Sequence, residues 1–472
     1  MQKILELIGF LNDNIVWGLP MVILMIGTGI YLCFITKGVI FIKFGTVMKY
    51  TINTLFRKPS KNEKAKGAIT PFQAVCTALA ATVGTGNIVG VALAISTGGP
   101  GALFWIWVSA LVGMVIKYCE VTLSVAYRSS NARGEIVGGP MYYISKGLGK
   151  KWLALIFAFF GFMASFGIGA SVQAHSLANG LNSTFSIDLG IIGIVVSVLS
   201  ALVFIGGIKR IASATEVLVP FMSIFYIIGT IIVLIINYKS IPSSLTSIFK
   251  SAFTGTSATG GFLGATVIYT CRIGMARGVF THEAGMGSAP IAHASASTDH
   301  PARQGLWGAF EVFFDSIVMC TITGLVILTS GMWCSNSLES ETSICSTAFE
   351  QSFYGGKYVV SVGLVLFAFA TIIAWYYYGE KCVEFIFKRS KLAIIIYQII
   401  YVLMVYVGCV ASLDTVWEFA DLFNGLMAIP NLIALIGLSS VVAKLSKDLF
   451  KNPHTIRDKN TDFSKFLIFK GK

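Results

Sequence analysis

The stretch AATVGTGN, residues 80–87, interrupts an apolar segment that is long enough to span a membrane. Two glycines that flank a threonine disfavour the centre of a helix, because each glycine costs about 1 kcal/mol relative to alanine. Within a bilayer, non-helical backbone is tolerated only where it is buried in protein or lines a cavity. The stretch therefore predicts either a site at mid-membrane depth, with freed backbone amides and carbonyls, or a notch where two helices approach closely.

The composition indicates a polytopic membrane protein. The 472 residues are 55% hydrophobic and only 12% charged, whereas soluble proteins average roughly 25% charged residues. We expect no cleavable signal peptide, because Glu6 and Asp13 precede the first long apolar run at 15–36. The nine cysteines include no C-x-x-C pair, which argues against a metal site or a disulfide scaffold. Cys334 and Cys345 are the one candidate pair.

At about 20 apolar residues per span, the sequence predicts eleven transmembrane segments. They lie at 15–36, 69–95, 101–126, 152–180, 188–206, 215–237, 260–294, 307–331, 358–378, 392–411 and 421–443. The segment at 260–294 is rich in glycine and carries charges, so we expect it to be irregular.

Lysine and arginine gather in every second loop. The loop at 37–67 holds eight basic residues against the single acidic residue Glu63, and the tail after Lys444 is also basic. Basic loops stay in the cytoplasm, so the amino terminus is predicted outside and the carboxyl terminus in the cytoplasm. The net charge of +13 is explained by these loops, and nucleic acid is not an expected partner.

A second interruption, FTHEAGMGSAP at residues 280–290, falls within the irregular segment. Glu283, Arg272 and Arg277 lie in this membrane-length run, where an unpaired charge costs at least a few kcal/mol. The alternative is a polar loop that joins two shorter helices.

The two breaks occupy matching positions once the first span is set aside. They fall in spans one and six of the remaining ten, as expected when two five-helix halves form an inverted repeat with discontinuous helices at the midplane. The predicted organisation is an extra N-terminal helix and basic loop at 1–68, repeats at 69–240 and 241–443, and a basic tail at 444–472.

Four motifs make the chain resemble the sodium:alanine (alanine or glycine:cation) symporter family. They are ATVGTGNI at 81–88, GGPGALFWIW at 98–107, ARGVFTHEAGMGSAPIAH at 276–293 and FAFATIIAWYYYGE at 367–380. The resemblance implies an all-α leucine-transporter fold of five plus five inverted helices with one additional N-terminal helix. It also implies sodium-coupled import of small neutral amino acids, chiefly alanine or glycine, across the inner membrane. The chain departs from the family at Ala370, where serine is frequent, and at His282, where asparagine is usual.

The resemblance implies a sodium site of hard oxygen ligands, the type that such cations prefer. Its ligands would be the carbonyls of Ala80, Val83 and Phe367 and the hydroxyl of Thr371. The alternative for Thr371 is a hydrogen bond back to its own helix. Asn87 is expected to orient the break or to coordinate an ion.

The resemblance likewise implies an amino-acid site built from both breaks. Its residues would be Thr82, Thr85, Gly86, Gln173, Phe280, Thr281 and Trp375. The amides of Thr85 and Gly86 would bind the carboxylate at a half-helix amino terminus, and carbonyls at Thr82, Phe280 and Thr281 would bind the ammonium group. An interhelical hydrogen bond is the alternative for Gln173, and ordinary packing is the alternative for Trp375.

Two other classes of function, a membrane enzyme and a channel, fit the sequence less well than a symporter. A membrane metal-hydrolase is disfavoured because the five histidines show no His-Glu-x-x-His spacing. A channel would need symmetric rings of ligands. The chain is thus expected not to be an enzyme and to need no cofactor besides co-transported sodium, with an amino acid and the bilayer as its partners. The exact substrate, sodium or proton coupling, the roles of Glu283 and His282, and the oligomeric state stay open.

Overall fold

Helices make up almost all of the computed structural model, which describes residues 2–55, 69–131, 134–254, 267–334, 341–388, 390–411, 414–451, 453 and 461–469. Two strands occur within these ranges, β1 (Ser129–Ser130) and β2 (Ile136–Val137), and they pair as an antiparallel hairpin. The predicted all-α class is therefore confirmed.

The chain begins with a long apolar helical stretch that corresponds to the predicted extra span. It comprises α1 (Gln2–Leu11), the π-helix η1 (Asn12–Val16) and α2 (Leu19–Ile35). The membrane-length part runs from Glu6 to Ile35, so it begins earlier than the predicted 15–36. The short helices α3 (Val39–Ile42) and α4 (Phe44–Leu55) follow it. The rest of the predicted basic loop, from residue 56 to residue 67, lies outside the described residues.

The predicted first break is confirmed. The span is divided into α5 (Pro71–Thr82), the 3-10 turn η2 (Thr85–Asn87) and α6 (Val89–Gly98), with a bend of 59°. Thr70 starts α5 with a capping box, in which its hydroxyl accepts from the Gln73 amide at 3.1 Å and the Gln73 side chain accepts from the Thr70 amide at 3.0 Å. Such reciprocal bonds satisfy two amides that a helix start otherwise leaves unpaired.

Five further helical units complete the predicted first half. They are α7 (Gly101–Ala126), α8 (Pro140–Gly147), the continuous α9–η3–α10 stretch (Lys151–Ala164, Ser165–Ser171 and Val172–Phe185), α11 (Leu189–Phe204) and α12 (Gly207–Ile236). Asp188 caps α11, because its carboxylate accepts from the amides of Gly190 and Ile191.

The second half begins with the turn η4 (Tyr238–Ser240) and α13 (Ile241–Thr254). The second break then separates α14 (Val267–His282) from the short α15 (Ala289–His293). The next elements are α16 (Pro301–Val312), the π-helix η5 (Phe313–Met319), α17 (Cys320–Ser330), η6 (Met332–Cys334) and α18 (Glu341–Ser352). The last are α19 (Gly356–Ile386), α20 (Lys391–Val410), α21 (Asp414–Leu426), α22 (Ala428–Gly437), α23 (Ser439–Lys451) and η7 (Ser464–Phe466).

The structure and the sequence give different numbers of spans. Among the described residues, eight helices are long and apolar enough to cross a membrane, and nine if the bent pair counts as one span. The predicted segment 188–206 forms a helix of only 16 residues, α11. The predicted segment 260–294 is divided by the second break, and its first residues lie outside the described ranges. The count of eleven therefore stays a prediction.

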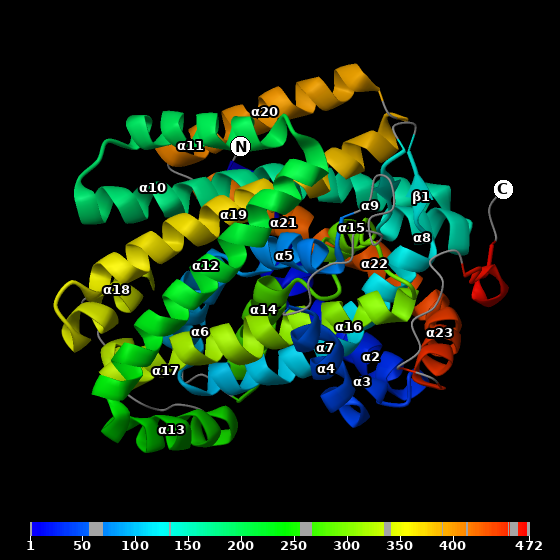
Figure 1. Ribbon diagram of the computed structural model, residues 1–472. Helices are drawn as coiled ribbons and strands as arrows, with labels where there is room; N and C mark the ends of the chain where they lie inside the picture. The colour runs from blue at the N-terminus through cyan, green and yellow to red at the C-terminus, as the bar shows by residue number, and fades with distance from the viewer. Residues whose placement is uncertain are drawn as a thin grey trace.

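The broken helices lie inside the bundle. Figure 1 shows α5 near its middle, and α11 and α20 packed side by side along one edge. α19 contacts α5, α9, α10 and α12, and α7 contacts both α14 and α16. The start of α5 is tied to the end of the second break, because Ile69 exchanges backbone hydrogen bonds with Ser295 and Ser297.

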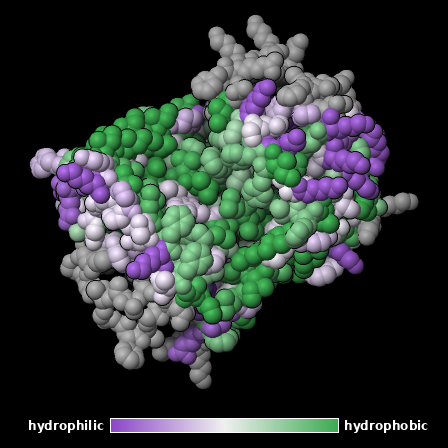
Figure 2. All heavy atoms as spheres, turned by 90° about the horizontal axis from the view of Figure 1, so that it is seen from below, coloured by the Kyte–Doolittle hydropathy of each residue, from purple (hydrophilic) through white to green (hydrophobic). Residues whose placement is uncertain are grey.

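The surface is apolar as well as the interior, and a few charged side chains are buried. Large apolar side chains such as Ile191 on α11, Phe221 on α12 and Leu403 on α20 are exposed, whereas Lys117 and Glu311 are fully buried. Figure 2 shows hydrophobic side chains across the middle of one face, with hydrophilic ones toward its ends. This is the pattern of a bundle that presents an apolar band to lipid. Cys345, one of the candidate pair, is a buried free thiol, and the side chain of Cys334 is outside the described residues.

Candidate functional site

The first break is held open by a polar side chain at its end. The amide of Gly84 donates to Asn87 Oδ1 at 2.9 Å, so Asn87 folds back over the turn that follows α5. Asn87 Nδ2 in turn donates to Asp315 Oδ1 at 2.7 Å and to the Asp315 carbonyl at 3.2 Å. Asn87 therefore orients the break and anchors it to η5, which is one of the two roles that the sequence left open.

Three of the four residues expected to hold sodium meet where α5 packs on α19. Thr371 Oγ1 lies 2.9 Å from the carbonyl oxygen of Ala80 and 3.0 Å from that of Phe367. The hydroxyl thus bonds back to its own helix, as in the alternative interpretation, and also reaches the broken helix; its role as a sodium ligand stays a prediction. Val83, the fourth residue, is fully buried at the end of α5. Two carbonyls and a hydroxyl form a set of neutral hard oxygens, which suits a small monovalent cation.

Gly84 lies against the same hydroxyl. A Cβ atom built on Gly84 would stand only 2.8 Å from Thr371 Oγ1. The close approach of α19 to the break therefore requires a glycine at this position.

The two breaks come together at Gly86. A Cβ atom at Gly86 would lie 3.0 Å from Thr281 Cγ2 and 3.5 Å from Phe280 Cδ1. Next to it, Thr85 Oγ1 donates to Gln173 Oε1 on α10 at 3.2 Å. The structure thus brings Thr85, Gly86, Gln173, Phe280 and Thr281 to one place, although they come from three separate parts of the chain.

A cavity of about 720 Å³ reaches this junction. Thr85, Gly86 and Phe280 line it together with Arg277 on α14 and Asp421 on α21. The Phe280 ring is only partly buried, with the Arg277 guanidinium 5.8 Å from its centre. A solute in the cavity would therefore meet backbone of the first break, one aromatic face and charges of both signs.

Backbone amides at the first break are free to bind a solute. Across the described ranges, the amides of Thr85 and Gly86 donate no hydrogen bond, although both residues are buried. Buried amides without a partner are rare, because they lose their bond to water without replacement. Both residues line the cavity, so the binding of a solute by their amides stays a prediction.

Four of the seven predicted substrate-site residues do not line the cavity: Thr82, Gln173, Thr281 and Trp375. The Trp375 side chain is fully buried, and its Nε1 donates to Glu283 Oε1 at 3.1 Å. The hydroxyl of Thr82 donates within its own helix, to the carbonyl of Ala78 at 3.3 Å. Trp375 thus connects α19 with the second break, and its role in substrate size stays a prediction.

Several buried polar residues were missed by the sequence reasoning. Glu120 on α7 accepts from the amide of Gly285, Asn431 on α22 donates to the same carboxylate, and Asp315 binds Asn87. Glu120 and Asp315 were visible in the sequence as charged residues within the predicted apolar segments 101–126 and 307–331. Intramembrane charges of this kind are expected to be paired and functional.

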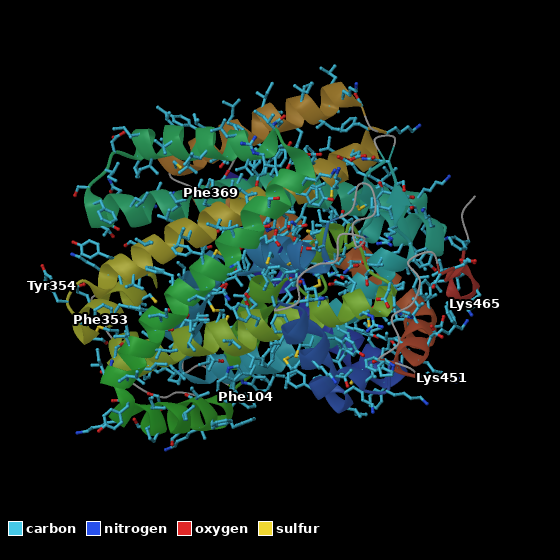
Figure 3. The ribbon with its side chains drawn as sticks, viewed as in Figure 1. Phe104, Phe353, Tyr354, Phe369, Lys451 and Lys465 are labelled. Atoms are coloured by element: carbon cyan, nitrogen blue, oxygen red, sulfur yellow. The ribbon has the colours of Figure 1, made fainter. Side chains whose placement is uncertain are left out.

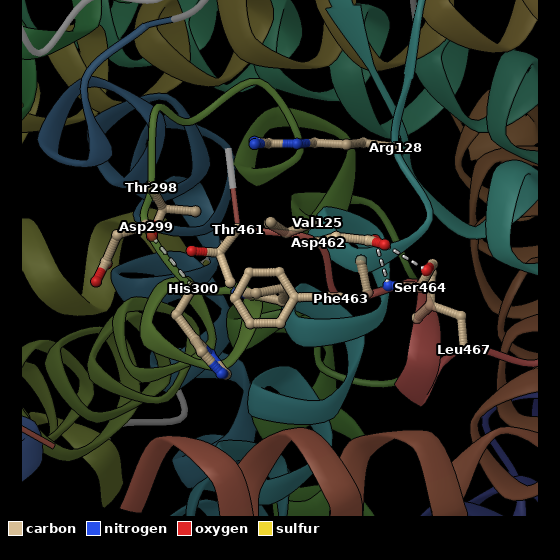
Figure 4. Close-up of a pocket in the computed structure, with 12 residues that line it drawn as sticks. Val125, Arg128, Thr298, Asp299, His300, Thr461, Asp462, Phe463, Ser464 and Leu467 are labelled. Atoms are coloured by element: carbon tan, nitrogen blue, oxygen red, sulfur yellow. Dashed lines mark hydrogen bonds between the residues drawn. The ribbon is translucent and has the colours of Figure 1, made fainter. Parts of the chain in front are cut away.

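A second cavity, of about 360 Å³, lies away from both breaks and contains none of the predicted site residues. Figure 4 shows it between the loop at 298–301 and the tail at 461–467. Phe463 packs on His300 with ring centres 4.7 Å apart. Hydrogen bonds from the backbone and hydroxyl of Ser464 lower the pKa of Asp462. The tail is therefore docked onto the end of the bundle at which α16 begins.

Comparison with known proteins gives consistent results. A sequence model of the sodium:alanine symporter family matches residues 1–464. The sodium/alanine symporter AgcS of Methanococcus maripaludis is 44% identical over 441 residues, which cover 92% of this chain and 95% of AgcS. The probable sodium/glutamine symporter GlnT of Bacillus subtilis is 38% identical over 97% of this chain and 93% of its own length.

Solved structures with little sequence similarity share the fold. MhsT in complex with L-phenylalanine aligns with a TM-score of 0.54 at 13% identity, covering 82% of this chain and 99% of MhsT. Mhp1, a nucleobase-cation-symport-1 family transporter, aligns with a TM-score of 0.51 at 12% identity, covering 87% of this chain and 84% of its own. Both have the leucine-transporter fold, so the fold that the family resemblance implies is confirmed, and the division into two inverted repeats stays a prediction.

Proposed function

The chain belongs to the sodium:alanine symporter family and is a sodium-coupled amino-acid symporter, and we propose that it imports small neutral amino acids, alanine and glycine, by alternating access. Family membership also places it among multi-pass membrane transporters rather than enzymes. The narrower statement about substrate and mechanism rests on the geometry of the first break.

One observation carries the proposal: two buried residues whose amides donate no hydrogen bond among the described residues line a cavity. The amides of Thr85 and Gly86 are positioned for an anionic group at the start of the second half-helix, where the helix dipole also favours negative charge. An amino-acid carboxylate has the right charge and supplies two acceptor oxygens. The carbonyls of Thr82, Phe280 and Thr281 would then receive the ammonium group.

Sodium would act from the other side of the same turn. We place it among the carbonyls of Ala80, Val83 and Phe367 and the hydroxyl of Thr371. Since Ala80 and Thr85 flank one turn, a cation bound at this junction would fix the backbone that presents the two amides. Sodium binding would therefore raise amino-acid affinity, and amino-acid binding would raise sodium affinity by the same factor.

Side-chain size would be limited by packing around Gly86. Phe280 and Thr281 approach this glycine closely, and Trp375 closes the α19 side of the second break. With the amino acid held at Gly86, these three side chains would limit the size of its side chain, which would favour alanine and glycine over larger substrates. GlnT is described as a probable sodium/glutamine symporter, and glutamine has a larger side chain than alanine. The preference for side-chain size is therefore the property to test.

The inward sodium gradient would set the direction of transport, and the proposed orientation has the amino terminus outside and the carboxyl tail in the cytoplasm. Figure 3 shows Lys451 and Lys465 at one end of the bundle and Phe353 and Tyr354 at the opposite end. Basic residues that gather at one end support a cytoplasmic position for that end.

The experiment is uptake of labelled alanine into proteoliposomes under an imposed inward sodium gradient. We expect concentrative uptake that stops when an ionophore dissipates the gradient, with glycine as a strong competitor and glutamine as a weak one. Equal inhibition by alanine and glutamine would overturn the size preference. Uptake that persists without any sodium gradient would overturn coupled import.

A further inference from the structure

A group of charged side chains is buried beside the second break, apart from the cavity at the first. It contains Lys117 and Glu120 on α7, Glu311 on α16 and Glu283 in the break. The first three are 0% exposed, and Glu283 is 3% exposed. One lysine thus faces three carboxyl groups, so the four residues would together carry an uncompensated negative charge if all were ionised.

Lys117 is committed to Glu311. Its Nζ atom lies 3.4 Å from Glu311 Oε1, and the other carboxylate oxygen lies 3.0 Å from His293 Nε2. Gln304 Nε2 donates to His293 Nδ1 at 2.9 Å, which leaves Nε2 of this imidazole to carry the proton toward Glu311. Glu311 Oε2 thus accepts from His293, and Oε1 has the ion-pair contact with Lys117 but no hydrogen bond among the described residues.

Glu283 is also satisfied as an acceptor. Its Oε1 receives the Trp375 Nε1–H at 3.1 Å, and its Oε2 receives the hydroxyl of Ser288. Neither oxygen needs a proton of its own to complete these contacts.

Glu120 is different, because one of its oxygens has neither a hydrogen bond nor a cation within ion-pair distance among the described residues. Oε1 accepts from the Gly285 amide at 2.9 Å and from Asn431 Nδ2 at 2.5 Å. Oε2 is buried and has no hydrogen-bond partner in the part of the chain that the structure describes. An ionised Glu120 would place negative charge on a bare, buried oxygen, which is far less favourable than a neutral hydroxyl in the same position.

We propose that Glu120 is a proton-binding site, with the proton on Oε2 and the carbonyl oxygen Oε1 held by Gly285 and Asn431. The site goes beyond amino-acid and sodium binding and does not depend on which substrate is carried.

Other titratable groups lie on the elements around this carboxyl. They are Lys117 and Cys119 on α7, Cys33 on α2, Tyr143 on α8, His282 and Glu283 at the second break, His293 on α15, Glu311 on α16 and Tyr378 on α19. His282 has a donor and an acceptor already, since Nδ1 accepts from the Ala284 amide and Nε2 lies 3.0 Å from Ser109 Oγ. Lys117 is the only lysine or arginine in this group, and it forms an ion pair with Glu311.

Proton binding at Glu120 would act on the backbone of the second break. Gly285 has φ +94°, and Asn431 contacts both its carbonyl oxygen, at 2.8 Å, and Glu120. Hydrogen bonds to an ionised carboxylate are shorter and stronger than those to a neutral acid. Loss of the proton would therefore tighten the hold on Gly285, and gain of the proton would loosen it.

Infrared difference spectroscopy of the purified full-length protein, titrated with acid and base in choline chloride, tests this assignment. A protonated carboxyl gives a C=O band that is resolved from carboxylate and amide absorption and shifts in D₂O. We expect the wild-type protein to show a band from a solvent-inaccessible acid near neutral pH, and Glu120→Gln to lack it. Glu216→Gln on α12 is the matched control, because this half-buried glutamate accepts from Gln73 outside the cluster, and the band should persist.

Two results would overturn the proposal: a wild-type protein without the band, or a Glu120→Gln protein that retains it. If Glu120→Gln cannot be purified, Asn431→Ala provides the second test. It removes one donor from Oε1 and should shift the frequency of the band. An unshifted band in Asn431→Ala would assign the proton to another carboxyl.

Discussion

The two helix breaks differ in chemistry although they meet at Gly86. Residues 80–87 of the first break include no charged side chain. Thr85 and Gly86, whose amides donate no hydrogen bond among the described residues, line a cavity. The second break carries Glu283, which is almost fully buried and bonded to Trp375 and Ser288. Gly285 and Gly287 adopt φ of +94° and +82° there, a region that favours glycine. The first break thus lines a cavity without charged side chains of its own, and the second is held in shape by side chains of the helices around it.

This comparison predicts different consequences of mutation. Changes at the second break should lower stability first, whereas changes at the first break should alter sodium dependence in a protein that stays folded.

Trp375→Ala should have the largest effect. Removing a fully buried tryptophan costs about 3–5 kcal/mol in unfolding free energy and also leaves Glu283 Oε1 without a donor. Thermal unfolding in detergent measures the loss. Trp375→Phe keeps most of the packing and loses the donor, so it should cost only about 1–3 kcal/mol.

The same variant tests the size preference. If Trp375 limits the substrate, Trp375→Ala should admit bulkier neutral amino acids as competitors at matched membrane levels. A destabilised protein with an unchanged competition profile would assign Trp375 to packing alone.

Gly84→Ala should impair sodium dependence without unfolding the protein. The new Cβ would stand 2.8 Å from Thr371 Oγ1, and overpacking of this kind costs about 1–3 kcal/mol. We expect the sodium concentration for half-maximal uptake to rise about tenfold to a hundredfold. Gly90→Ala is the control, because Gly90 lies on α6 beyond the same break and a Cβ atom there would have no heavy atom within 4 Å. Equal effects of the two variants would show that Gly84 has no special relation to Thr371.

Thr371→Ala removes one oxygen from the proposed sodium site. A lost ligand on a buried cation should raise the half-maximal sodium concentration by about tenfold. Alanine affinity at saturating sodium should change much less, because the amides of Thr85 and Gly86 are untouched. Sodium titrations of uptake measure both quantities, and an unchanged sodium dependence would leave coordination to the carbonyls.

Ala370→Ser should have the smallest effect and the opposite sign. Ala370 is fully buried beside Thr371, and an added hydroxyl there could supply the oxygen that related sequences carry. We expect a decrease in half-maximal sodium concentration of about twofold to threefold, by analogy with a single modest hydrogen bond. An increase would indicate overpacking and no gap in the ligand set.

The sequence predicted the two breaks better than their surroundings. The glycines at 84 and 86 mark the first break locally, and the position of Glu283 in an apolar segment marks the second. The contact of Thr371 with Ala80 joins residues 291 positions apart, and only the family resemblance pointed to it. The bonds of Glu120 with Gly285 and Asn431 span 165 and 311 positions, and no local pattern encodes them.

The count of spans shows another limit of local reasoning. α11 is apolar throughout but only 16 residues long, because Asp188 caps its start and a turn at 205–206 precedes α12. Hydropathy alone cannot separate such a helix from a full span, since packing and bilayer thickness decide how a short helix is accommodated.

The central claim is that one turn of the first break binds the amino-acid carboxylate through backbone amides and requires sodium beside it. Calorimetric binding to the purified protein tests it directly, with alanine and alaninamide each titrated in sodium chloride and in choline chloride. We predict binding of alanine in sodium only, and no measurable binding of alaninamide in either salt. Equal binding of alanine in both salts, or equal binding of alanine and alaninamide in sodium, would contradict the account.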